Sequence, residues 1–154
     1  MWTVNPSPFS TIYVNIIVYI FIENKSLNIE HLVFNQGPKR VGPFSHAVKA
    51  GDFLFVTGQM PTLPNDPTKL IEGDISNQTH QVMKNLKTVL TAANSSLENA
   101  VFVRIYLVNF QDFDAMNAIY ESYFAPGKLP ARTCIGVTGL AVGASVEIDL
   151  IAKF

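Results

Sequence analysis

The strand-forming segments of this chain are apolar on both sides, and this feature constrains the fold more than any other. In DFLFVTGQ (52–59), Phe53 and Phe55 alternate with Leu54 and Val56. Successive side chains of a strand point to opposite faces of a sheet, so both faces here carry large apolar groups. An antiparallel sheet with one solvated face would instead show polar residues at alternate positions. We therefore expect both faces of the sheet to be covered.

The same kind of pattern predicts the other elements. A helix beginning after Asp74 or Ser76, either of which can cap it, has apolar residues at spacings of three and four. A second helix is predicted from about Asp112 to residue 124, and the segment 61–73, which contains three prolines, is predicted to be a loop. The last two strands are expected to form a hairpin folding near Val142. The strands are predicted at 30–35, 44–50, 52–59, 100–108, 131–137 and 145–154.

The order β-β-β-α-β-α-β-β implies a single α+β domain, with one mixed sheet and two helices on one of its faces. No element predicted from the sequence covers the other face. The charged fraction is only 15% and the hydrophobic fraction is 48%, which leaves apolar surface that an oligomer can bury. We therefore expect the second sheet face to meet another subunit.

The predicted domain spans 29–154, and residues 1–28 form an extension of unknown role. Its apolar run TIYVNIIVYIFI (11–22) is interrupted by Asn15 and stops at Glu23, so it is shorter than the roughly 20 residues that a membrane-spanning helix needs. Residues 1–10 lack the Lys or Arg of a secretory signal. A membrane partner is not expected. Three interpretations of the extension remain: an added strand or arm, a poorly ordered segment, or a targeting or anchoring role.

Charge and cysteine content limit the classes of function and the cellular compartments that fit this chain. The net charge is −1, and the only adjacent basic pair is Lys39-Arg40, which argues against a nucleic-acid partner. One cysteine cannot form an internal disulfide and suits a reducing compartment, so we expect the cytoplasm, with the mitochondrion as the alternative. No metal site is predicted, because metal-ligand spacing is absent among the histidines, which are His31, His46 and His80.

A few polar residues interrupt the apolar strands and are the candidates for chemistry. Arg132 shares a strand face with Cys134, and Glu147 shares one with Asp149. A buried arginine must meet an anion, because an unpaired buried charge is costly, and its planar fork suits a carboxylate. The residues alone leave two alternatives open, an internal ion pair with Glu147 or Asp149 and a bound ligand. The predicted hairpin would separate Arg132 from Glu147 by about 13–17 Å, which favours partners from a neighbouring subunit.

Five segments, in this order and spacing, resemble the RidA family, also called YjgF or L-PSP: GPFSHAV (42–48), FVTGQMP (55–61), FDAMNAIYESYF (113–124), PARTCIGV (130–137) and VEIDLIA (146–152). The resemblance covers about residues 30–154. It implies a chorismate-mutase-like fold and a homotrimer, with an inner β-barrel and clefts between subunits. It also implies hydrolysis of 2-imino acids or their enamine tautomers, such as 2-iminobutanoate and 2-iminopropanoate, to 2-keto acids and ammonia. No metal or organic cofactor is implied.

The resemblance also implies residue roles. Arg132 would hold the substrate carboxylate, and Glu147 would position or activate water. Cys134 would line the cleft without acting as a nucleophile, in keeping with the absence of a histidine placed to activate it. The other implied substrate-binding residues are Gly58, through its backbone, Asn117, Thr57 in place of a common serine, and Phe44 in place of a frequent tyrosine.

Two further functions stay open beside the deaminase. One is an endoribonuclease or translation inhibitor, the older label for this family, against which the near-zero charge and the lack of a His/Lys cluster argue. The other is a non-enzymatic trimer that binds small ligands or acts like a chaperone. The presence of both Arg132 and Glu147 argues against it.

Overall fold

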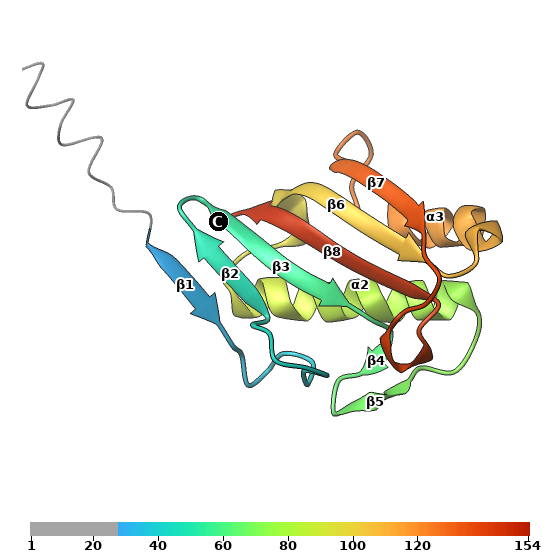
Figure 1. Cartoon of the computed structure of the whole chain (residues 1–154). Helices are drawn as coiled ribbons and strands as arrows, with labels where there is room; N and C mark the ends of the chain where they lie inside the picture. The colour runs from blue at the N-terminus through green and yellow to red at the C-terminus, as the bar shows by residue number, and fades with distance from the viewer. Residues whose placement is uncertain (1–27) are drawn as a thin grey trace, which may run out of the picture.

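The computed structural model describes residues 28–154; the extension, with its apolar run 11–22, lies almost entirely outside the described residues. One six-stranded sheet has two helices on the same face (Figure 1), which confirms the α+β class. The helices are α2 (Ile75–Ala92) and α3 (Phe113–Glu121). In spatial order the strands are β1 (Ile29–Leu32), β2 (Ala47–Ala50), β3 (Phe53–Gln59), β8 (Val146–Lys153), β6 (Ala100–Leu107) and β7 (Ala131–Gly136).

The expected hairpin of the last two strands is wrong. Strand β7 pairs with β6 in parallel at the edge of the sheet, whereas β8 lies between β3 and β6 and is antiparallel to both. A connection that contains the short 3-10 helix Ala141–Gly143 precedes β8. The central position suits β8 because Val146, Ile148 and Leu150 are almost completely buried there, which favours folding through the hydrophobic effect.

The segment 61–73, predicted as a loop, contains a small antiparallel pair instead. Its strands are β4 (Thr62–Leu63) and β5 (Asp66–Leu70). Proline cannot donate a backbone hydrogen bond, but an edge strand tolerates this because one side of it is unpaired. Pro67 lies in β5, the partner of β4 alone. The Asp66 carboxylate accepts bonds from the backbone N and the hydroxyl of Thr68, at 3.1 and 2.6 Å, which stabilises the turn.

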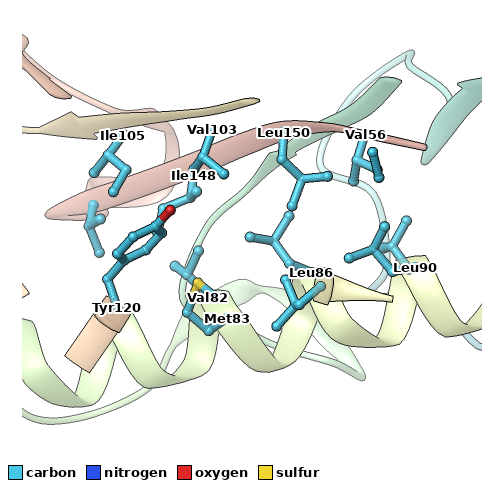
Figure 2. Packing of buried hydrophobic residues seen from close by; sticks show 14 of the residues in the cluster. Val56, Val82, Met83, Leu86, Leu90, Val103, Ile105, Tyr120, Ile148 and Leu150 are labelled. Atoms are coloured by element: carbon cyan, nitrogen blue, oxygen red, sulfur yellow. The ribbon is translucent and has the colours of Figure 1, made fainter. Parts of the chain in front are cut away.

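Helix α2 begins at the predicted cap. The Asp74 carboxylate accepts a bond from the backbone N of Asn77 at 3.0 Å, and the Asn77 side chain accepts one from the backbone N of Asp74 at 3.3 Å. This reciprocal pair satisfies donors that the first turn otherwise leaves unpaired. Side chains of α2, α3 and the sheet point toward one another and form the core, as Figure 2 shows for Leu86, Tyr120 and Ile148.

The opposite face of the sheet is open within residues 28–154 (Figure 1), as the sequence predicts. Phe53 and Phe55 lie on it and are 44% and 46% exposed, whereas Leu54 and Val56 are buried. The alternation of β6 is interrupted near its start. The register of β6 and β8 shifts between Ala100 and Phe102, and Val101 is exposed, whereas Val103 is buried.

Candidate functional site

Arg132 lies beside helix α3 at the edge of the sheet, in a hollow of ≈ 430 Å³ that Asn117 and Tyr120 also line. One guanidinium nitrogen, Nη1, donates to Oδ1 of Asn117 at 2.6 Å. The guanidinium carbon is 5.0 Å from the centroid of the Tyr120 ring and 5.8 Å from that of Phe113. Aromatic faces and a neutral amide orient this cation without neutralising it.

Arg132 makes no ion pair within residues 28–154. The internal pair that the sequence left open is formed by another arginine. Nε of Arg104 is 2.8 Å from Oδ1 of Asp149, and the Tyr106 hydroxyl donates to Oδ2 of Asp149 at 3.0 Å. The sequence places Arg104 and Asp149 on regular strand faces but does not show that β6 and β8 are neighbours, so this cluster was missed.

Glu147 lies on the open face, opposite Tyr106 in the pairing of β8 with β6. Its side chain passes over Gly58 of β3, where the pairing of β3 with β8 is irregular between Val56 and Gln59. A Cβ atom at Gly58 would lie 2.8 Å from the carboxyl carbon of Glu147 and closer still to one of its oxygens. Real side chains do not approach so closely, so the glycine creates the space that Glu147 occupies.

Burial raises the pKa of the Glu147 carboxyl above its ordinary value, and the negative charge of Asp149 raises this pKa further. Both effects disfavour the ionised carboxylate, the first through lost hydration and the second through like-charge repulsion. The carboxylate of Glu147 therefore takes up a proton more readily than a solvated one. This property suits a general base that accepts a proton from water near neutral pH.

Arg132 and Glu147 lie on opposite faces of the sheet. Residues paired directly across a ladder share a face, and neighbours along a strand alternate. Arg132 pairs with Val103 of the core face, whereas Glu147 pairs with Tyr106 of the open face. The two groups therefore cannot converge on one small molecule within a single copy of the chain. Their meeting requires a second copy.

The other predicted site residues divide between the surroundings of Arg132 and those of Glu147. Cys134, paired with Ile105, shares the face of Arg132, and Asn117 contacts Arg132 directly. On the Glu147 side, Phe44 and Gly58 line one small hollow. Thr57 precedes Gly58 on β3, and its backbone N donates to the carbonyl of His46 at 3.1 Å. The structure thus brings together two groups of predicted residues rather than one.

Cys134 is half-buried and packs against the hydrophobic core. Burial raises the pKa of its thiol, and the positive charge of Arg132 opposes this shift only in part. A thiol with a raised pKa is protonated at neutral pH, and the protonated form is a poor nucleophile. The surroundings of Cys134 therefore favour the neutral thiol over the thiolate that covalent catalysis needs.

We expect Cys134→Ser to keep most of the imine-hydrolysing activity that the family resemblance implies, because a raised pKa keeps the Cys134 thiol protonated. The measurement is kcat/KM for imine hydrolysis, with the oligomeric state checked on the same sample. A loss of about a thousandfold or more in an intact oligomer would point to a covalent thiol mechanism. Thiol alkylation is a weaker test, since a bulky adduct can block the cleft without any chemical role for the sulfur.

The described residues contain no cluster of His, Cys, Asp and Glu that could hold a metal ion. Two of the histidines serve structural roles. His46 accepts a bond from the backbone N of Phe34 at 3.0 Å, and Nδ1 of His80 is 3.0 Å from the Tyr123 hydroxyl. Within the same residues, every helix is too short or too polar to cross a membrane.

Comparisons with a family model and with single proteins match nearly the same part of the chain. The family model for endoribonuclease L-PSP matches residues 34–154. A RutC family protein of Pyrococcus horikoshii is 41% identical over 125 residues, which cover 80% of this chain and 98% of that protein. The mitochondrial protein MMF1 of Saccharomyces cerevisiae is 37% identical over 115 residues, covering 75% of this chain and 77% of that protein.

Solved structures share the fold. RidA from the Antarctic bacterium Psychrobacter has a TM-score of 0.73 and 31% identity, and the match covers 81% of this chain and 99% of that one. Escherichia coli TdcF, solved with bound serine, has a TM-score of 0.74 and 26% identity, and the match covers 81% and 98% of the two chains.

Proposed function

This chain belongs to the endoribonuclease L-PSP family, which includes RidA and YjgF, and on that premise we propose that it hydrolyses 2-imino acids to 2-keto acids and ammonia. The observation that carries the proposal is Arg132. Its guanidinium is oriented by Asn117 and two aromatic rings but meets no carboxylate among residues 28–154. It is therefore available to bind the carboxylate of a substrate in a bidentate pair.

The active site is proposed to lie between copies of the chain in a homotrimer. The opposite faces of Arg132 and Glu147 support this arrangement, as does the exposure of Phe53 and Phe55 on the open face. One subunit supplies Arg132 for the substrate carboxylate, and its neighbour supplies Glu147 for water. Apolar side chains on an uncovered sheet face are typical of surfaces buried by association.

The proposed chemistry needs positioning and one proton acceptor. Glu147 accepts a proton from water while the water oxygen bonds to the imine carbon. The C=N electron pair moves to nitrogen, which takes up a proton, and a carbinolamine results. After the nitrogen is protonated again, the C–N bond breaks with its electron pair going to nitrogen, the oxygen forms the C=O bond of the keto acid, the hydroxyl proton passes to a base, and ammonia leaves. No atom changes oxidation state overall, so binding geometry and general base catalysis suffice.

The bound serine of the Escherichia coli relative supports the proposed substrate class. Serine has a carboxylate next to a nitrogen-bearing carbon, and a 2-imino acid has the same arrangement with a double bond to nitrogen. We place the reaction in the cytoplasm. The mitochondrion is the alternative, since one relative is named as a mitochondrial protein.

The direct test generates 2-iminobutanoate or 2-iminopropanoate in situ with an amino-acid oxidase and traps the remaining imine with semicarbazide. The wild-type protein is expected to lower the amount of trapped imine in proportion to its concentration. Glu147→Gln, which keeps the shape but removes the base, is the matched control and should abolish the effect. Equal trapping with and without wild-type protein would reject the proposed function.

The family's name makes endoribonuclease the second candidate. The same preparation should therefore be incubated with single-stranded RNA over several purification steps. The chain has a net charge of −1, which gives little electrostatic attraction for a phosphate backbone. We expect RNA cleavage to decline with purification. Cleavage whose rate per mole of this protein stays constant through purification, and which disappears in Arg132→Ala, would favour the ribonuclease.

The trimer is a separate prediction. Light scattering at micromolar concentration is expected to give about three times the 17.0 kDa of one chain. Phe55→Asp is a useful variant, because it introduces a charge on the open sheet face, where Phe55 is 46% exposed. It should dissociate the assembly and abolish hydrolysis together. A monomeric wild-type protein with full activity would rule out a site shared between copies.

A further inference from the structure

Two hollows share a cationic wall, and the smaller of them also reaches Gly58. The smaller, of ≈ 20 Å³, is lined by Phe44 and Gly58 among other residues, and the larger is ≈ 440 Å³. Lys39 and Arg40 line both of them. No aspartate or glutamate is among the residues that line either hollow. The wall that both hollows share is thus positively charged, and the smaller hollow is lined by Gly58, next to which the Glu147 carboxyl lies.

Arg40 is held in place while most of its hydrogen-bonding capacity stays unused. Its Nη1 donates to the backbone carbonyl of Phe44 at 2.6 Å, and the residue is exposed. A guanidinium has five donors in a fixed fork. Arg40 forms no ion pair within residues 28–154. The remaining donors can therefore bind an anion without first breaking an internal pair.

The loop that carries Arg40 is anchored to the domain by His46, which is 3% exposed. Nδ1 of His46 accepts a bond from the backbone N of Phe34, and Nε2 donates to the carbonyl of Pro38 at 2.8 Å. A Cβ atom at Gly37 would approach Nε2 of His46 to 2.9 Å, so the loop fits closely over the ring. This anchoring gives Arg40 a defined position and makes it part of a preformed wall.

We propose that Arg40 binds a second carboxylate of the substrate, and that the substrates this chain prefers are 2-imino dicarboxylic acids such as 2-iminoglutarate. This inference rests on the proposed function, in which Arg132 of a neighbouring copy binds the first carboxylate and Glu147 activates water. An imino acid that corresponds to an amino acid with an acidic side chain carries a second carboxylate, and this is the anion that Arg40 would bind. The larger hollow provides volume for it, and the adjacent Lys39 adds positive charge.

The first experiment compares kcat/KM for 2-iminoglutarate and 2-iminobutanoate, each generated in situ and trapped with semicarbazide. The wild-type protein is expected to prefer the dicarboxylate. Arg40→Ala should lower the ratio of the two constants by about tenfold, the effect of a charge-assisted hydrogen bond near the lower end of its usual range. Arg40→Lys should recover part of the ratio, because it keeps the charge without the fork.

Lys87→Ala is the matched control, because it removes one positive charge from a different hollow, on the outer side of α2. It should leave the ratio unchanged. An equal ratio in wild type and Arg40→Ala, or an equal fall in Lys87→Ala, would overturn the inference. Hydrolysis of 2-iminobutanoate in either case would still support the proposed function.

A second readout does not depend on catalysis. Calorimetric titration with 2-oxoglutarate and 2-oxobutanoate measures the affinity for the two product acids. The wild-type protein should bind 2-oxoglutarate more tightly, and Arg40→Ala should remove that difference. If neither imine is hydrolysed but this pattern appears, the proposed reaction fails while anion selection by Arg40 stands. Equal wild-type affinity for both acids would reject the role of Arg40.

Discussion

Arg132→Ala is expected to lower kcat/KM for 2-iminobutanoate by about one to several orders of magnitude and to leave the melting temperature nearly unchanged. A charge-assisted contact to a carboxylate contributes roughly 1.5–3 kcal/mol or more in a desolvated cleft, and about 1.4 kcal/mol corresponds to a tenfold change. Stability should persist because Arg132 donates only to the neutral Asn117 amide and stacks near Tyr120. Arg132→Lys should restore part of the activity, since an ammonium lacks the planar fork.

Arg104→Ala provides the contrasting case for this prediction. Arg104 pairs with Asp149, which is only 8% exposed, so its removal leaves a buried carboxylate with Tyr106 as its remaining side-chain partner. Such a change lowers stability. Melting temperature and imine hydrolysis should therefore be measured on one preparation of each variant. Wild-type hydrolysis by Arg132→Ala would exclude Arg132 as the substrate anchor, and a large fall in its melting temperature would assign it a structural role.

Gly58→Ala should reduce kcat by about a hundredfold, because the new methyl group would occupy the space of the Glu147 carboxylate. The added Cβ would lie 2.8 Å from the carboxyl carbon, so Glu147 must move away. Displacing a catalytic group by about 1 Å is sufficient for a loss of this size. The backbone at Gly58 is that of a strand, so an alanine there should leave the fold intact.

Gly139→Ala is the matched control, since a Cβ atom at Gly139 would have no neighbour within 4 Å. It should behave like the wild-type protein in both kcat and melting temperature. A normal kcat in Gly58→Ala would show that Glu147 does not need its observed position. A loss of folded protein in Gly58→Ala, with Gly139→Ala unaffected, would instead make Gly58 a requirement of the sheet.

The sequence predicted the faces of single strands better than the order of strands. The alternation of Leu54 and Val56 with Phe53 and Phe55 correctly assigned the two pairs to opposite faces, and the structure buries the first pair and exposes the second. The alternation within β8 also held, because it depends only on the two-residue period of a strand. The position of β8 between β3 and β6 was missed. Strand order depends on connections and on competing pairings over long distances, which local periodicity does not contain.

This difference also explains what could be predicted of the site. The cost of burying a charge singled out Arg132 in the sequence. In the structure it contacts Asn117, another residue that the family resemblance assigns to substrate binding. The relation of Arg132 to Glu147 required the registers of two ladders, Val103 with Arg132 and Tyr106 with Glu147. The expected hairpin pointed to a neighbouring subunit because of distance. The structure supports the same inference for another reason, the opposite faces of one sheet.

Mixing two inactive variants tests most directly whether the site is shared between copies. Arg132→Ala and Glu147→Gln subunits are unfolded together in equal amounts, refolded, and assayed for 2-iminobutanoate hydrolysis beside each variant refolded alone. In a cyclic trimer with sites between neighbours, every mixed assembly contains one intact site, so random mixing should restore about a quarter of wild-type activity. Each variant alone should stay inactive. If the mixture, shown by mass spectrometry to contain mixed trimers, is as inactive as its components, Arg132 and Glu147 do not act together across an interface.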